Sequence, residues 1–283
     1  MKKILSISLL FLASAASANP AIVAHRGGTA DAPENTLPAI KLALENKADI
    51  VWITVQLSRD GVPVLYRPVD LNALSNLQGK VSQYTAEELA KADASVKWKD
   101  KNQLSASIPT LKSVVTTWPE TRFFIDIKSP DADPATMGIA LLNVLKETNS
   151  LNRIRVYSTE DRYLDALPAE IPRFVTRSET RTRLATVSLS HECLSPSKTM
   201  DDYWYGLELN RKVEVVEKFT LGEGISPATL TWDKEAIDCF RSQGNAHLIF
   251  IGVNSEEDYQ KAKTLGADGV LVDSPAKARS WAK

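Results

Sequence analysis

The alternation of two kinds of apolar segment is the feature that most limits how this chain can fold. Short runs rich in β-branched and apolar residues alternate with longer stretches in which apolar residues recur at helical spacing. The short runs predict eight strands, at residues 21–24, 50–57, 62–66, 122–127, 154–157, 173–176, 247–253 and 269–272. The longer stretches predict helices at residues 33–46, 111–118, 134–148, 160–167, 233–243, 256–265 and 275–282. Strands that alternate with helices favour a parallel sheet.

Eight such strands in a chain of 283 residues predict an α/β fold of the closed (β/α)8 TIM-type barrel. Several strands are apolar nearly throughout, as expected where other structure covers both faces of a sheet. An open doubly wound sheet is the alternative, and it is disfavoured because no Gly-rich dinucleotide-binding loop follows any strand. Residues 178–232 follow neither period, and we predict an elaborated loop region there.

The first 18 residues, MKKILSISLLFLASAASA, are predicted to be a secretory signal peptide. They have two lysines, an apolar run and a small-residue A-S-A sequence that ends at Ala18. The apolar run is shorter than the roughly 20 residues that a membrane-spanning helix needs. We therefore expect residues 1–18 to be cleaved, residues 19–283 to form a single domain, and the protein to be exported, most simply to a bacterial periplasm.

Charge and cysteine content limit which classes of binding partner and which cellular compartment are expected. The whole chain has a formal net charge of −1, and loss of the two signal-peptide lysines lowers it by two, to −3. That balance provides no field for nucleic acid or for an anionic membrane, so a small molecule is the expected partner and no stable membrane insertion is expected. The sequence specifies no protein partner. In an oxidising compartment the two cysteines, Cys193 and Cys239, should form a disulfide.

The sequence AHRGGTADAPENT at residues 24–36 resembles the opening motif of the glycerophosphodiester phosphodiesterases. In that family H-R-G ends the first barrel strand and P-E-N-T opens the next helix. Further similar stretches follow in the family's order: QLSRDGVPVL, GKVSQYTAEELAKAD, IPTLKSVV, FFIDIKSP and LGADGVLVDSP. The resemblance covers most of the mature chain and implies a barrel of the phosphatidylinositol-phospholipase-C-like phosphodiesterase superfamily.

The resemblance also implies a chemistry, the hydrolysis of glycerophosphodiesters to glycerol 3-phosphate and an alcohol. In the family two histidines act as acid and base, and acidic residues hold a Ca²⁺ or Mg²⁺ ion that neutralises the phosphate. This division of roles is physically reasonable. Displacement at phosphorus builds charge on the non-bridging oxygens, which cations stabilise, and imidazoles transfer protons well near neutral pH.

Five residues of this chain match the family's site. His25 and Arg26 match the first histidine and its arginine neighbour, and Glu34 matches the glutamate of P-E-N-T. Asp126 stands where the family has the glutamate of the fourth strand, and Lys128 matches the lysine that follows it. We therefore predict that His25 contacts the reacting group and that Arg26, Glu34, Asp126 and Lys128 bind substrate.

Three further positions depart from the family's pattern. The Glu-x-Asp pair of the second strand falls on Trp52 and Thr54, and the second histidine falls on Arg67. Two metal ligands and one general acid/base are therefore missing, and we predict no tightly bound metal and no other cofactor. Arg67 cannot act as a base, because a guanidinium stays protonated, but it can supply fixed positive charge to a phosphate. The metal-independent phosphatidylinositol-specific phospholipases C, which share the fold, also place an arginine near the phosphate.

Several of these residues have a second, purely structural interpretation. His25 faces a ligand or is a hydrogen-bonded structural histidine, and Arg26 clamps a phosphate or is a strut paired to Glu34 or Asp126. Asp126 and Lys128 share one face of a strand, so they form either a catalytic pair or a buried ion pair. Trp52 forms a stacking wall for a substrate head group or fills the core.

The remaining histidines, His191 and His247, belong to no motif, and surface or core positions are expected for both.

Two functional hypotheses from different classes follow. The first is a binding protein that retains the phosphate pocket and has impaired or no metal-dependent hydrolysis. The second is a divergent phosphoric diester hydrolase that uses His25 and Arg67 without a tightly bound metal. The missing ligands favour the first, and the retained H-R-G and P-E-N-T motifs favour a phosphate site in either case.

Overall fold

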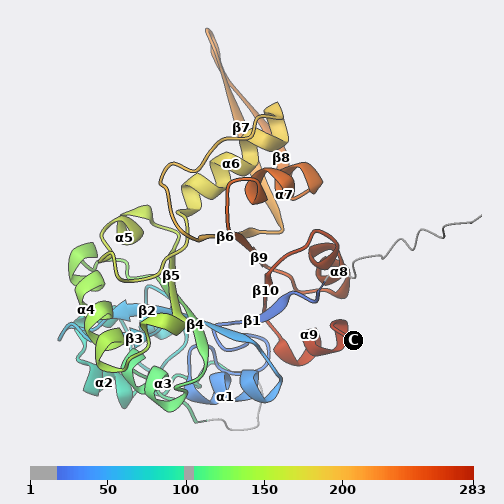
Figure 1. The fold of residues 1–283 in the computed structure, drawn as a ribbon. Helices are drawn as coiled ribbons and strands as arrows, with labels where there is room; N and C mark the ends of the chain where they lie inside the picture. Colours follow the sequence, from blue (N-terminus) through green and yellow to red (C-terminus); the bar gives the residue numbers. More distant parts are fainter. Residues whose placement is uncertain (1–17, 99–104) are drawn as a thin grey trace, which may run out of the picture.

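Seven parallel strands curve around a common axis, and helices cover their outer faces (Figure 1). The computed structural model describes residues 18–98 and 105–283, so the predicted signal peptide, apart from Ala18, lies outside the described residues. The strands lie in the order β5-β4-β2-β1-β10-β9-β6. Their bounds are β1 (Ala21–His25), β2 (Ile50–Leu57), β4 (Arg122–Ile127), β5 (Ile154–Ser158), β6 (Tyr203–Glu208), β9 (Ala246–Ile251) and β10 (Gly269–Val272).

A short extended segment lies between the two edge strands of this sheet, β5 and β6. Phe174 donates its backbone N–H to the carbonyl oxygen of Val156 in β5, at 2.9 Å. Val175 donates its N–H to the carbonyl oxygen of Trp204 in β6, also at 2.9 Å. The predicted strand at 173–176 therefore takes the eighth position and closes the barrel, although its regular pairing is limited to one bridge, between Val156 and Arg173.

One strand that the sequence places in the barrel lies outside it. β3 (Pro63–Leu65) pairs antiparallel with β2 and, among the described strands, with no other. Only residues 58–61 separate the two predicted strands, and a parallel connection needs a dozen or more residues. The assignment of 62–66 to the barrel is therefore wrong. β6, which was not predicted, is the barrel strand that completes the set of eight.

The loop region predicted at 178–232 is also wrong. That stretch contains most of helix α6 (Arg177–Ser190), strand β6 and a long antiparallel ribbon of β7 (Asn210–Phe219) and β8 (Gly222–Thr231). The helix hides its period because its buried face includes a charged residue. Arg183 is 2% exposed, lies over the Phe240 ring, and donates to the Tyr205 hydroxyl and the Leu194 carbonyl oxygen.

The other predicted helices form within their expected stretches but are shorter. They are α1 (Leu37–Glu45), α3 (Leu111–Thr117), α4 (Pro134–Glu147), α5 (Asp161–Asp165), α7 (Lys234–Arg241), α8 (Glu256–Thr264) and α9 (Pro275–Trp281). α1 begins late because Asn35 has a left-handed φ of 59° and Thr36 caps the helix by accepting from the Ala39 N–H. The sequence did not indicate α2 (Ala86–Ala90) or the short 3₁₀ turns Leu71–Ala73, Val81–Gln83 and Leu151–Arg153.

The predicted disulfide is confirmed. Cys193, which follows α6, and Cys239 in α7 are joined with a Cα–Cα distance of 5.5 Å. In the part of the chain that the structure describes, no helix has the length and apolar character needed to cross a membrane.

Large apolar side chains fill the inside of the barrel. They come from successive strands and from the closing segment: Val23, Ile50, Trp52, Phe124, Tyr157, Phe174, Ile249 and Leu271. This plug makes the barrel a packed core, so chemistry is restricted to the loops and strand ends at its two rims.

Candidate functional site

Polar side chains gather where the parallel strands end, at the rim that carries the active site in barrels of this kind. His25 is the last residue of β1, Glu208 is the last residue of β6, and Asp273 directly follows β10. Asp126 is the penultimate residue of β4. Because β10, β1, β2 and β4 are consecutive neighbours in the sheet, three of these four side chains belong to one arc of the rim.

His25 is held from both sides of its ring. Its Nδ1 lies 2.6 Å from Asp273 Oδ1, and Arg26 donates its Nε–H to His25 Nε2 at 3.0 Å. Because Nε2 accepts, we assign the imidazole proton to Nδ1, which donates to the carboxylate. This hydrogen bond is the main reason that the pKa of Asp273 lies below its usual range. Asn254 also donates to Asp273, at 2.8 Å.

Arg26 is a strut in this structure. Its Nη1 lies 2.5 Å from Glu34 Oε2, and both side chains are largely buried. The loop can bring the two together because Gly27 has a φ of 82°, and a Cβ at that position would come within 3.0 Å of the Ala39 Cβ. Of the two partners considered from the sequence, Glu34 is therefore the one that Arg26 has.

Asp126 and Lys128 form a mostly buried pair, with 3.6 Å between Asp126 Oδ1 and Lys128 Nζ. Burial raises the pKa of Asp126 to about 6, and the positive charge of Lys128 opposes that rise. Burial also lowers the pKa of Lys128, which donates to the Thr159 hydroxyl at 2.5 Å. The geometry agrees with the ion-pair alternative.

Trp52 and Thr54 occupy the positions that the resemblance assigns to two carboxylates. In the sheet register Trp52 is the neighbour of His25, and Thr54 is the neighbour of Asp126. Trp52 is 2% exposed, and its ring centroid lies 4.9 Å from that of Tyr157, which agrees with the core-filling alternative. No negative charge stands at either position.

Arg67 follows β3 at the rim and is exposed. It has no hydrogen bond or ion pair within the described ranges 18–98 and 105–283, but its charge is close enough to Lys128 to lower the pKa of that lysine. Arg67 therefore lies in the neighbourhood of the Asp126–Lys128 pair.

A second charged cluster at the rim was not anticipated from the sequence. Arg177 donates to the Tyr157 hydroxyl at 2.8 Å and forms an ion pair with Glu208 at 2.5 Å, and Arg211 also contacts Glu208, at 3.1 Å. Three of these residues lie at or next to the region without a recognisable period. Asp273 was also missed, although it stands in the family-like stretch LGADGVLVDSP, where an acidic residue directly after a strand was the available signal.

The other two histidines lie away from this rim. His191 is exposed at the end of α6, and its hydrogen bond with Glu235 raises the pKa of the imidazole. His247 is the second residue of β9, at the opposite end of the barrel, where it stacks on Trp204 and pairs with Asp202 at 2.8 Å. Surface or core positions were expected for both, and the structure places both histidines outside the site.

The rim residues do not fit a tightly bound Ca²⁺ or Mg²⁺ ion. Glu34 Oε1 and Asp126 Oδ1 are buried without a hydrogen-bond partner among the described residues, so acceptors remain unfilled. Each carboxylate nevertheless has its own cation, Arg26 or Lys128. Nowhere in residues 18–98 and 105–283 do three or more His, Cys, Asp or Glu side chains converge as a metal site would require.

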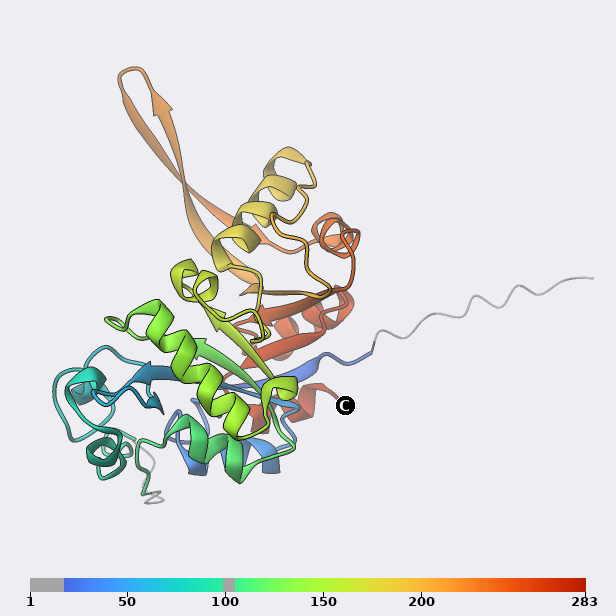
Figure 2. The same ribbon diagram turned by 60° about the vertical axis from the view of Figure 1, so that its left-hand side comes forward.

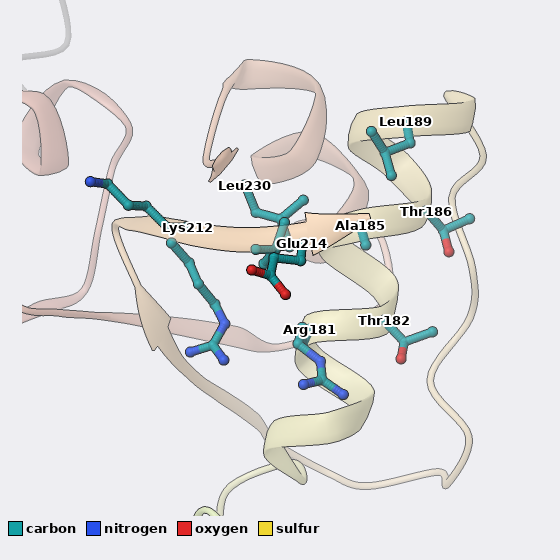
Figure 3. Close-up of a pocket in the computed structure, with 10 residues that line it drawn as sticks. Arg181, Thr182, Ala185, Thr186, Leu189, Lys212, Glu214 and Leu230 are labelled. Atoms are coloured by element: carbon teal, nitrogen blue, oxygen red, sulfur yellow. The ribbon is translucent and has the colours of Figure 1, made fainter. Parts of the chain in front are cut away.

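A cavity of about 510 Å³ lies apart from the family-motif residues, between α6 and the start of β7. Figure 3 shows Arg181 and Ala185 on the helical wall and Glu214 on the strand opposite. Its lining contains a single carboxylate and no histidine or cysteine, so it offers no acid–base pair, and we assign it no part in the chemistry of the rim.

Comparison with known proteins finds relatives along nearly the whole chain. The chain is 39% identical over 277 aligned positions to the uncharacterised protein Rv2277c of Mycobacterium tuberculosis, covering 93% of this chain and 90% of that protein. It is 33% identical to a glycerophosphodiester phosphodiesterase of Caldanaerobacter subterraneus, covering 90% of this chain and 94% of the relative.

Solved structures show the same fold. The glycerophosphoryl diester phosphodiesterase domain of Rv2277c superposes with a TM-score of 0.85 at 37% identity, covering 94% of this chain and all of that domain. A phosphodiesterase of Oleispira antarctica, in complex with the product sn-glycerol 3-phosphate, superposes with a TM-score of 0.68 at 22% identity, covering 93% of this chain and 96% of the other. The model of the glycerophosphoryl diester phosphodiesterase family matches residues 25–277, and this chain belongs to that family.

Proposed function

We propose that the barrel rim binds the phosphate of a glycerophosphodiester or of glycerol 3-phosphate and does not hydrolyse it rapidly by a metal-dependent route. The observation that carries this proposal is the replacement of two carboxylate positions by Trp52 and Thr54 beside a rim that keeps His25 and gains Arg67. Arginines suit a phosphate through charge-assisted hydrogen bonds, and they repel a divalent cation.

The polar groups around the rim support a ligand with both a phosphate and hydroxyls. Arg67 has no anionic partner in the described chain and is exposed, so it can contact phosphate without breaking an ion pair. The unfilled acceptor oxygens of Glu34 and Asp126 suit hydroxyl donors of a glycerol unit once the rim adjusts around it. The Oleispira antarctica phosphodiesterase, which shares the fold, was solved with sn-glycerol 3-phosphate.

Metal-independent hydrolysis is the second candidate, and the His25–Asp273 pair favours it. A histidine oriented by a carboxylate is a common arrangement for a general base. In this structure, however, the Nε2 atom that would take the proton accepts a hydrogen bond from Arg26. Arg26 is itself fixed by Glu34, so catalysis would require both contacts to rearrange. For this reason we place binding first.

The site of action that we propose is the bacterial periplasm. The support is the N-terminal sequence with signal-peptide character and the disulfide, which persists in oxidising compartments.

We expect glycerol 3-phosphate to raise the melting temperature of the mature chain and Ca²⁺ or Mg²⁺ to leave it unchanged. A ligand that binds only the folded state stabilises it in proportion to the logarithm of its concentration over Kd. Arg67→Ala and His25→Ala should each reduce the effect, because they remove a cation and a hydrogen-bonding ring from the rim. The measurement is thermal melting over a concentration series of each compound.

Arg122→Ala is the matched control for Arg67→Ala, since Arg122 is exposed at the start of β4, at the other end of the barrel. It should respond to glycerol 3-phosphate as the unmodified chain does. Neither rim variant should have a much lower melting temperature in buffer alone. Arg67 is exposed, and Asp273 still accepts a hydrogen bond from Asn254 when His25 is replaced. If glycerol 3-phosphate raised the melting temperatures of the Arg67 and Arg122 variants equally, Arg67 would not be part of the binding site.

A further inference from the structure

The ribbon of β7 and β8 extends away from the body of the protein (Figures 1 and 2). The two strands are ten residues each and are paired along their whole length, from Asn210 with Thr231 to Phe219 with Gly222. Ten residues of extended chain span roughly 33 Å. The ribbon begins directly after β6, so its base lies at the rim of the barrel and its tip lies far from it.

The outer half of the ribbon is unusually apolar for an exposed structure. Leu221 is 100% exposed, Phe219 is 62% exposed and Ile225 is 61% exposed. Val216, which is 49% exposed, is the register partner of Ile225. Half of the eight large apolar side chains that are most exposed in the described chain therefore gather on this one tip. Single exposed apolar residues are ordinary on soluble proteins, but a gathered set marks an interaction surface.

The tip carries little net charge. Lys218 and Glu223 are register partners directly behind the turn, and their charged groups lie 3.8 Å apart. Together with Glu217 they give residues 216–225 a formal charge of −1. A partner of the tip is therefore attracted by apolar burial and not by an opposite charge. The long Lys218 side chain can also keep its ammonium in water while its stem lies against apolar material.

A lipid surface fits this tip better than another protein does. The four side chains together offer roughly 600 Å² at most from one side, which is below the roughly 800 Å² that each partner buries in a standard protein interface. Pairing of the ribbon edges with a second copy would satisfy backbone groups but would leave Phe219 and Leu221 in water. The interfacial region of a bilayer, in contrast, deforms around a narrow convex tip and accepts aromatic and aliphatic side chains at headgroup depth.

We propose that the β7–β8 tip docks the protein reversibly on a zwitterionic phospholipid surface, with Phe219 and Leu221 as the inserted side chains. This contact is peripheral and spans nothing. It does not depend on which ligand the barrel rim binds. Because β7 continues from β6, docking also tethers the rim to the membrane through the ribbon.

The test is flotation of the disulfide-bonded mature chain with phosphatidylcholine vesicles. The unmodified chain should float with the vesicles, and Phe219→Ser with Leu221→Ser should reduce the apparent affinity at least tenfold, because two largely exposed apolar side chains lose their burial in lipid. High salt, or addition of anionic lipid, should change binding less than twofold. Both replaced side chains are exposed, so the melting temperature should stay the same.

Val69→Ser with Ile139→Ser is the matched control, since these residues are 58% and 57% exposed elsewhere on the surface. It should bind vesicles like the unmodified chain. Absence of flotation, or equal loss in the tip and control variants, would overturn the proposal. So would sedimentation of the unmodified chain as a dimer that the tip variant loses, because that result would make the tip a protein interface.

Discussion

Replacing Cys193 by serine is expected to lower the free energy of unfolding by about 4 kcal/mol. The bridge to Cys239 spans 46 residues, and a cross-link of that length removes about this much conformational entropy from the unfolded chain. The closed segment contains β6 and the whole β7–β8 ribbon. Denaturant unfolding without reductant measures the difference.

The single replacement at Cys193 is the informative one. Cys193 is exposed, whereas Cys239 is 6% exposed, so serine at 193 breaks the bridge without placing a hydroxyl in the core. Reducing the unmodified chain with dithiothreitol should give the same stability as the variant, and the variant itself should not respond to reductant. A loss below about 1 kcal/mol would contradict the entropic account of the bridge.

Asp126→Asn should gain about 2.5 kcal/mol of stability relative to the unmodified chain as the pH rises from 4 to 7. Burial raises the pKa of Asp126 from 3.8 to about 6, so the folded state holds this proton more tightly than the unfolded state does. The unmodified chain therefore loses stability as the pH rises through that interval, and each unit of pKa difference is worth about 1.4 kcal/mol. Asparagine at 126 removes this pH dependence.

Urea unfolding at pH 4, 5, 6 and 7 measures this prediction, with the exposed Asp201→Asn as the matched control. The control should stay parallel to the unmodified chain over the whole range. The opposite slope would show that the attraction of Lys128 outweighs burial, so that the folded state prefers the charged carboxylate. Asp126 would then be a stabilising partner in an ion pair and not a strained one.

The barrel could be predicted because its strands are nearly continuous apolar runs separated by amphipathic helices. The error at β3 arose from treating every apolar run as a barrel strand, although the connection from β2 to β3 is too short for a parallel crossover. The error at 178–232 has a different cause. Arg183 is buried in α6 through stacking and hydrogen bonds, and no pattern of apolar spacing reveals a buried arginine of this kind.

The candidate site also has a part that the sequence could predict and a part that it could not. The motif placed His25, Arg26 and Glu34 correctly at one rim, because sequence neighbours on a strand end and the following loop stay together in space. The partner of His25 lies 248 positions away, and it reaches the imidazole only because β10 pairs with β1 when the barrel closes. The contact between Arg177 and Glu208 likewise depends on β6, which was not recognised.

The most direct test of the proposed function is release of glycerol 3-phosphate from glycerophosphocholine by the mature chain. The assay is run with chelator, with Ca²⁺ and with Mg²⁺, beside calorimetric titration of glycerol 3-phosphate. We expect binding of glycerol 3-phosphate in all three conditions and no release above the blank in any of them. Release that Ca²⁺ or Mg²⁺ stimulates, and that His25→Ala abolishes, would contradict the account and show that the rim is a metal-dependent catalytic centre.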